Sequence, residues 1–408
     1  MKTVTLLIVG FIVLINHTEC LSQVTETLLA EDNSFVISSM SGFSVSPDGK
    51  LITFCDRSSG NLYVYQYIDG SLHSAYMPSI QLSDSIAMKG VYPKKNKKLA
   101  FIRELIGKDG KMAPQHVISA SLSNQFHVSK FINDSLVACI GQFFCMVKDV
   151  STVDSIIKGR ATFGGIVVIN INKKVIVSCS PCEYGGLNTF VQTSTLLPLG
   201  EDSLILPVAN YDAVDNMGYD SAWTLAMYSI SGSLRSYINS FPHEGVLYNL
   251  MYSNMDQQLC RDSSGSILCT FQSLPYIYNI STNKKIHLDN LVSKNDIFFE
   301  KVKSLRLQKS TQIQWDSLYL DKPFFVTSVE STGDSYYVIL ANRLQLNPWR
   351  VLRSVHKYNM DGIFVKKIEF SQIDLPNLQN LFYDAKNKLV VQAIKASNGW
   401  KLLKMKWE

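Results

Sequence analysis

The most polar stretch of the chain, residues 210–220 (NYDAVDNMGYD), contains the residue types that could bind a metal ion. Its hard oxygen donors are Asp212, Asp215, Asn216 and Asp220. Ca²⁺ prefers such oxygens, but a calcium site needs about six to eight of them, and the spacing here differs from that of an EF-hand loop. The stretch therefore predicts either a Ca²⁺ site on these four residues or a polar loop between strands that holds no metal.

Acid–base or metal-assisted catalysis would need several histidines, carboxylates or amides that converge on one point. The histidines of this chain stand singly and share no spacing. His243 and Glu244 are adjacent, and adjacent residues on a strand point to opposite faces. The chain also lacks the G-x-S-x-G pattern of a hydrolase nucleophile. We therefore predict no catalytic residue and no required cofactor.

Three pairs among the eight cysteines are close in sequence, namely Cys139 with Cys145, Cys179 with Cys182, and Cys260 with Cys269, and the last two pairs differ in character. Cys179 and Cys182 have the spacing of a redox or zinc pair, but no second C-x-x-C accompanies them. Cys260 and Cys269 flank the turn-forming residues Asp-Ser-Ser-Gly, so their sulfurs could meet across a hairpin. The Cys260–Cys269 pair is the predicted disulfide.

The N-terminus has the pattern of an export signal. Lys2 precedes an apolar run, residues 6–15, that is shorter than the about 20 residues of a membrane helix. Small residues at Thr18 and Cys20 favour cleavage after Cys20, and lipidation of Cys20 is the alternative. We predict a protein exported to the periplasm, associated with the outer membrane, or secreted. No later apolar run is long enough for a membrane helix.

The composition is that of a globular protein, with 46% hydrophobic and 18% charged residues. A net charge of +5 is mild for this length, and the one basic cluster is typical of a solvated hairpin tip, at Lys94, Lys95, Lys97 and Lys98. We therefore expect no nucleic-acid partner. A monomer that binds a protein, peptide or glycan is the expected state.

Short apolar runs alternate with turn residues along the whole chain. The first example places Pro47 and Gly49 in a tight turn between two β-type runs. Comparable hairpin turns follow at 92–98, 131–135, 169–174, 199–203, 252–256, 331–335 and 383–388. A second kind of turn closes outer strand pairs at 68–71, 230–233 and 359–362.

This spacing suits blades of about 40 to 50 residues with four antiparallel strands each, the unit of a β-propeller. We predict an all-β chain with a signal peptide at 1–20, a linker at 21–36 and a single propeller at 37–408, with six blades favoured over seven. The alternating strand 402–407 is expected to close the ring by pairing near Phe35.

The SPDGK turn at 46–50, together with the phrases KYNMDGIFVKKIEF and FQSLPYIYNISTNKKI, resembles the TolB-like six-bladed propeller proteins. These are exported, often lipid-anchored proteins of Bacteroidetes-type bacteria. The resemblance implies a six-bladed propeller outside the cytoplasm and brings no catalytic residues with it. We expect an exported, non-enzymatic binding protein that recognises a ligand at its loop face. The alternative is a propeller hydrolase, lactonase or lyase with a metal in the central channel.

Overall fold

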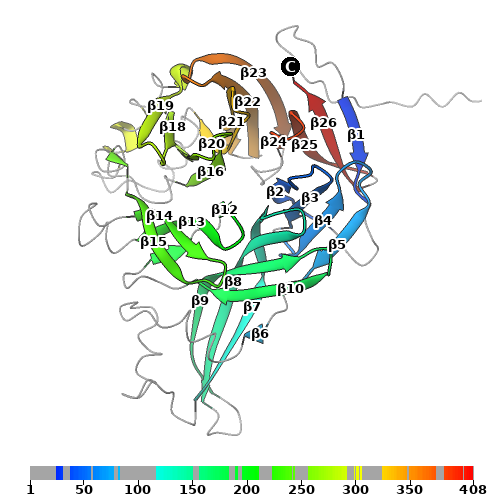
Figure 1. Ribbon diagram of the computed structural model, residues 1–408, viewed down its shortest axis with the longest axis vertical. Coiled ribbons are helices and arrows are strands. Elements are labelled where there is room, and N and C mark those ends of the chain that lie inside the picture. Colours follow the sequence, from blue (N-terminus) through cyan, green and yellow to red (C-terminus); the bar gives the residue numbers. More distant parts are fainter. Residues whose placement is uncertain are drawn as a thin grey trace, which may run out of the picture.

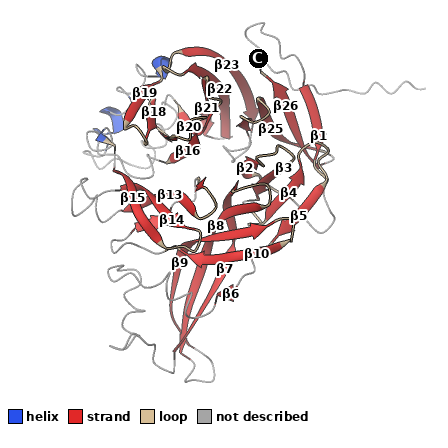
Figure 2. Cartoon of the chain, in the orientation of Figure 1, coloured by secondary structure: helices blue, strands red, loops and turns tan. Residues whose placement is uncertain are grey.

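A computed structural model of the chain describes residues 24–30, 37–56, 58–77, 81–82, 116–149, 156–182, 189–191, 195–210, 223–240, 242–243, 256–291, 298, 300–302, 304–305, 324–346, 349–373, 381–397 and 399–407. Its strands form six antiparallel sheets around a ring (Figure 1), so the predicted all-β propeller with six blades is confirmed. Helix among these residues is confined to short pieces, such as residues 289–291 and 300–302 (Figure 2).

The first three blades follow one another along the chain. Blade one consists of β2 (Ser41–Val45), β3 (Leu51–Cys55), β4 (Leu62–Gln66) and β5 (Leu72–Tyr76). Blade two consists of β6 (Gln81–Leu82), β7 (His116–Phe131), β8 (Leu136–Asp149), β9 (Ile156–Asn170) and β10 (Val175–Pro181). Blade three consists of β11 (Thr189–Val191), β12 (Leu197–Leu199), β13 (Ser203–Asn210), β14 (Trp223–Ser229) and β15 (Leu234–Ser240).

The remaining blades complete the ring. Blade four consists of β16 (Gln257–Arg261), β17 (Ile267–Phe271), β18 (Tyr276–Asn279) and β19 (Lys284–His287). Blade five consists of β20 (Phe325–Ser331), β21 (Ser335–Leu346), β22 (Trp349–Asn359) and β23 (Phe364–Ile373). Blade six consists of β24 (Leu381–Asp384), β25 (Leu389–Ala396), β26 (Gly399–Lys406) and β1 (Val24–Leu28).

The two ends of the chain share blade six. The last strand, β26, pairs with β1 in the register Val24 to Met405 through Leu28 to Lys401. The expected closure therefore forms, but its partner strand lies upstream of Phe35 and inside the segment 21–36 that was predicted to be a linker. The β1 sequence VTETL mixes β-forming and polar residues, which suits an outermost strand that is largely exposed.

The turn of residues 46–50 has the predicted hairpin geometry. Gly49 adopts a φ of 78°, and its N–H donates to the Ser46 carbonyl at 2.8 Å. The Ser46 hydroxyl donates to Asp48 Oδ1 at 2.6 Å and accepts from the Leu51 N–H at 2.9 Å. The hydrogen bond from the Ser46 hydroxyl, followed by the one from the Lys50 N–H, lowers the pKa of Asp48 to about 2.

Large aromatic rings fill the seams between blades. Phe54 stacks on both Tyr63 and Tyr65 at ring distances of 5.6 Å, and Phe43 stacks on Phe382 of blade six at 4.8 Å. Such rings bury large apolar areas and pair favourably at these separations. Tyr63 and Tyr65 are core residues, each only 1% exposed.

The antiparallel order of each blade gives the ring two unlike faces. The short-turn face carries the connections from first to second and from third to fourth strand, none longer than five residues, as at 46–50 and 262–266. At the opposite face, called here the long-connection face, the strands are joined by the remaining connections, and the longest of these in the sequence are between β6 and β7, β13 and β14, and β19 and β20. The long insertions of the sequence therefore follow strand ends that point away from the short-turn face.

Blade two also extends away from the ring as an arm. Strands β7, β8 and β9 have 16, 14 and 15 residues, whereas each strand of blade one has five. The pairing of β7 with β8 shifts register between Leu122 and Val128, where the arm leaves the blade. Such bulges bend strands, and the arm leads away from the ring in the lower part of Figure 1.

Candidate functional site: the central channel

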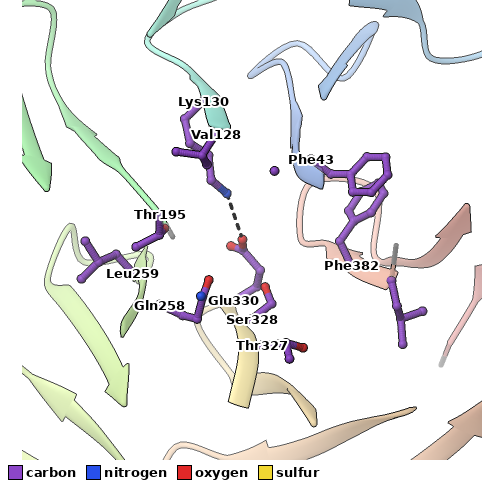
Figure 3. A pocket seen from close by; sticks show the side chains of 12 residues that line it. Phe43, Val128, Lys130, Thr195, Gln258, Leu259, Thr327, Ser328, Glu330 and Phe382 are labelled. Carbon is purple, nitrogen blue, oxygen red and sulfur yellow. Dashed lines mark ion pairs between the residues drawn. The ribbon is translucent and has the colours of Figure 1, made fainter. Parts of the chain in front are cut away.

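A pocket lies on the axis of the ring, where the inner edges of all six blades meet. Its volume is about 50 Å³, which is room for roughly three to five water-sized groups. Each blade contributes at least one residue to its wall, in order Phe43, Lys130, Thr195, Gln258, Glu330 and Phe382 (Figure 3). The mixture of charged, amide, hydroxyl and apolar groups makes this pocket the candidate site.

An ion pair crosses the channel. Lys130 Nζ of blade two lies 3.7 Å from Glu330 Oε1 of blade five, the blade on the opposite side of the ring (Figure 3). The two side chains are 24% and 25% exposed, and the surface they expose faces the pocket. The pair therefore links two blades that do not touch as neighbours.

The ion pair lies toward one end of the channel. Lys130 and Glu330 each stand one residue before the end of their inner strands, β7 and β20, at the short-turn face. Gln258 and Phe382 belong to the first halves of β16 and β24, which begin at the long-connection face, and Phe43 is the central residue of β2. The ion pair therefore lies at the short-turn end of the pocket lining, and the other lining residues extend from it toward the long-connection face.

The protein environment holds a proton on Glu330 more tightly than water does. Burial among the inner strands raises the pKa of this carboxyl; the Lys130 ammonium opposes that effect, and the charge of Asp384 adds to it. The net pKa is raised. Channel water still reaches part of the carboxyl, so Glu330 is a partly hydrated charge with a single close counter-ion.

Glu330→Gln should therefore change how stability depends on pH. A carboxyl whose pKa is raised by folding stabilises the fold below its ordinary pKa, and that contribution is lost as pH rises through the folded pKa. We expect the free energy of unfolding of the wild type, minus that of the variant, to decrease as pH is raised from the ordinary pKa of a glutamate toward neutral. Urea titrations across this range measure the difference, and an increase with pH would show that the carboxylate is stabilised in the channel instead.

The predicted calcium residues Asp212, Asp215, Asn216 and Asp220 lie outside the described residues, in the sequence between β13 and β14. Cys20, the candidate for lipidation, also lies outside them. Within the described ranges no group of three or more histidines, cysteines, aspartates or glutamates is placed to hold a metal ion. The Ca²⁺ site remains a prediction.

The predicted Cys260–Cys269 disulfide does not form in the structure. Cys260 of β16 pairs with Leu268, and Cys269 of β17 pairs with Leu259, so the register is one residue away from the required one. A shift of one residue places the two sulfurs on opposite faces of the blade. Both thiols are buried and free, and they belong to the seams on either side of blade four.

The other cysteine pair of interest lacks the environment of a reactive thiol. Cys182 is fully buried and Cys179 is partly buried, and both are free. Burial raises the pKa of the Cys179 thiol to about 12 and raises that of Cys182 as well. Nucleophilic or metal-binding cysteines need a thiolate, so these two side chains fill space in blade two.

A histidine network missed by the sequence pattern lies in the seam between blades four and five. His356 Nε2 is 2.9 Å from the Ser354 hydroxyl, and His356 Nδ1 is 3.3 Å from Asn290 Nδ2. The Tyr358 hydroxyl donates to Asn290 Oδ1 at 2.7 Å. Ser354 and His356 are only 7% and 8% exposed, so the network joins two blades rather than facing a substrate.

The sequence pattern also did not single out Lys130 and Glu330 as site residues. The residues one position before the end of the inner strands are Ser44, Lys130, Pro198, Cys260, Glu330 and Tyr383, and only two of them carry a charge. Opposite charges at equivalent positions of two hairpins were thus the available signal. Their pairing follows only once six blades place these two opposite each other.

Comparisons with known proteins find similar solved structures and no matching family. The sequence matches no protein-family model and no curated protein. Similar solved structures include a Bacteroides fragilis protein assigned as exported, with a TM-score of 0.47, 9% identity and 95% of each chain covered. They also include the calcium-binding protein regucalcin from Agrobacterium tumefaciens, with a TM-score of 0.38, 9% identity and 94% and 93% covered.

A third similar structure is the acylaminoacyl peptidase of Pyrococcus horikoshii, with a TM-score of 0.39 and 11% identity, covering 89% of this chain and 43% of the peptidase. A propeller scaffold alone does not select among functions. Among the described residues, no helix has the length and apolar character needed to cross a bilayer.

Proposed function

We propose that this protein is an exported, non-enzymatic binding propeller that recognises a protein, peptide or glycan at its long-connection face. The observation that carries the proposal is the Lys130–Glu330 ion pair, which sets a lysine ammonium against the one carboxylate that lines the described pocket. Propeller enzymes that use a channel metal need several ligands at that place, and here a lysine occupies the position beside the carboxylate.

The asymmetry of the ring supports the choice of face. The short-turn face has hairpins of at most five residues, whereas the long-connection face carries every longer connection and the origin of the blade-two arm. Binding residues in rigid folds are concentrated on long loops held by a scaffold. The apolar core of the export signal at residues 6–15 supports a location outside the cytoplasm.

A matched pair of variants tests the proposal. The purified chain is screened on a glycan array and a displayed peptide library, and the ligands found are retested on two variants. One replaces residues 211–222 with a Gly-Ser linker, and the other combines Asp334→Ala with Lys388→Ala at the short-turn face. We expect loss of binding in the first variant and unchanged binding in the second.

The alternative function, a channel-metal hydrolase, lactonase or lyase, makes the opposite predictions. It requires stoichiometric metal in the purified protein and turnover of an ester or lactone that stops with a chelator. Finding both would overturn the binding proposal. The intact mass of the exported protein shows whether cleavage follows Cys20 or a lipid is attached there.

A further inference from the structure

The short-turn end of the channel presents two opposite charges, and the hydrogen-bonding capacity of neither one is fully used. Charge-assisted hydrogen bonds between an ammonium and a carboxylate are about 2.7–2.9 Å long, whereas Lys130 Nζ and Glu330 Oε1 are 3.7 Å apart. Within the described part of the chain, this ion pair is the one polar contact of either side chain. An ammonium has three donors and a carboxylate two acceptor oxygens, so both retain unused capacity.

The two charges together disfavour ligands that are only cationic or only anionic. A cation that approaches Glu330 meets Lys130 at a similar distance, and an anion that approaches Lys130 meets Glu330. Because the two charges are equal in size and lie at similar distances from such a ligand, the attraction to one and the repulsion from the other nearly cancel. A ligand gains from both residues only if it carries both charges close together.

The size of the pocket and the residues that line it restrict the class of ligand further. A volume of about 50 Å³ holds roughly three to five water-sized groups, which matches the five heavy atoms of an α-ammonium and α-carboxylate joined by one carbon. The side chains of Gln258 and Ser328 add an amide and a hydroxyl beside the ion pair. Apolar side chains complete the wall, at Phe43, Leu259 and Phe382.

We propose that the channel binds a free α-amino acid with an apolar side chain, with its ammonium on Glu330, its carboxylate on Lys130 and its side chain pointing toward the long-connection face. This inference rests on the proposed binding function and assigns a second, small-molecule ligand to the same protein. The ion pair then acts as a recognition element as well as a link between blades two and five.

Calorimetric or ligand-detected NMR titrations with L-alanine and L-leucine test the proposal. Acetate and methylammonium serve as half-ligands that carry one charge each. We expect both amino acids to bind and the half-ligands to bind at least about tenfold more weakly, because each offers only one charge. Lys130→Met and Glu330→Gln should each weaken amino-acid binding by about tenfold or more.

The surface ion pair of Lys367 and Glu369 in β23 provides the matched control. It is also a lysine–glutamate pair, it is exposed, and it lies away from the channel. Lys367→Met should leave amino-acid binding unchanged. The proposal is overturned if neither amino acid binds at up to about 10 mM, or if Lys130→Met and Glu330→Gln bind as tightly as the wild type. Because glycan and peptide binding are measured separately, that failure would leave the loop-face function standing.

Discussion

Replacing Gly362 with alanine is expected to lower the free energy of unfolding by about 3 kcal/mol or more. Gly362 has a φ of +83°, which costs a residue with a Cβ about 1–2 kcal/mol. A Cβ at this position would also lie 2.0 Å from the carbonyl oxygen of His287, the last residue of β19 in the preceding blade. Backbone must move to accommodate it, and equilibrium denaturation by urea measures the loss.

Gly265→Ala is the matched control. Gly265 has the same φ of +83°, but a Cβ there would meet nothing within 4 Å. Its cost should therefore be limited to the backbone strain, about 1–2 kcal/mol. Equal losses in the two variants would contradict the prediction, because they would show that blades four and five do not meet closely at Gly362.

The same contact recurs at alternate seams of the ring. A Cβ at Gly70 would lie 2.0 Å from the carbonyl oxygen of Leu28, and one at Gly232 would lie 2.1 Å from that of Pro181. In each case a turn of blade one, three or five closely contacts the backbone of the outermost strand of the preceding blade. The similar turns at 68–71, 230–233 and 359–362 are thus explained by a shared interblade contact.

These turns show how far the sequence could predict the fold. Local turn chemistry identified the hairpins at 131–135, 199–203, 331–335 and 383–388, because glycine, asparagine and aspartate mark positions that other residues occupy poorly. It could not tell which strands a turn joins. The turn at 169–174 joins the third and fourth strands of blade two, β9 and β10, and not the first and second.

Ring closure and the ion pair in the channel were harder to predict, because both depend on which strands lie next to or opposite one another and not on local turn residues. Pairing of β1 with β26 joins residues almost a whole chain apart, and nothing local in VTETL marks it as the partner. Cys260 and Cys269 flank a hairpin turn as expected, yet a one-residue register difference places them on opposite faces. The Lys130–Glu330 pair depends on the number of blades, a property of the closed ring.

The second large effect is expected at Asp56, a carboxylate that is 0% exposed. Its oxygens accept hydrogen bonds from the hydroxyls of Ser38 at 2.9 Å and Ser59 at 2.8 Å, and from the Ser39 N–H at 3.0 Å. These bonds fix the segment that leads from the closing strand β1 into blade one. Asp56→Ala should lower the free energy of unfolding by about 3–4 kcal/mol, because several buried donors would lose their acceptor.

The pH dependence of stability shows whether the charge of the Asp56 carboxylate causes the expected loss of stability. Burial raises the pKa of Asp56, but the hydrogen bonds from Ser59, Ser58, Ser38 and Ser39 outweigh it, and the net pKa is lowered. A carboxyl with a lowered pKa stabilises the fold above its ordinary pKa, and this contribution is lost as pH falls through the folded pKa. The deficit of Asp56→Asn relative to the wild type should therefore be largest near neutral pH and shrink in acid.

Asp69 provides the control for this experiment. It also accepts two hydrogen bonds from one serine, the Ser71 N–H at 2.8 Å and hydroxyl at 2.7 Å, but it lies in an exposed turn of the same blade. Asp69→Ala should change stability little, because water replaces the lost acceptor. A deficit of Asp56→Asn that does not vary with pH would mean that the shape of the side chain, and not its charge, holds the entry to blade one.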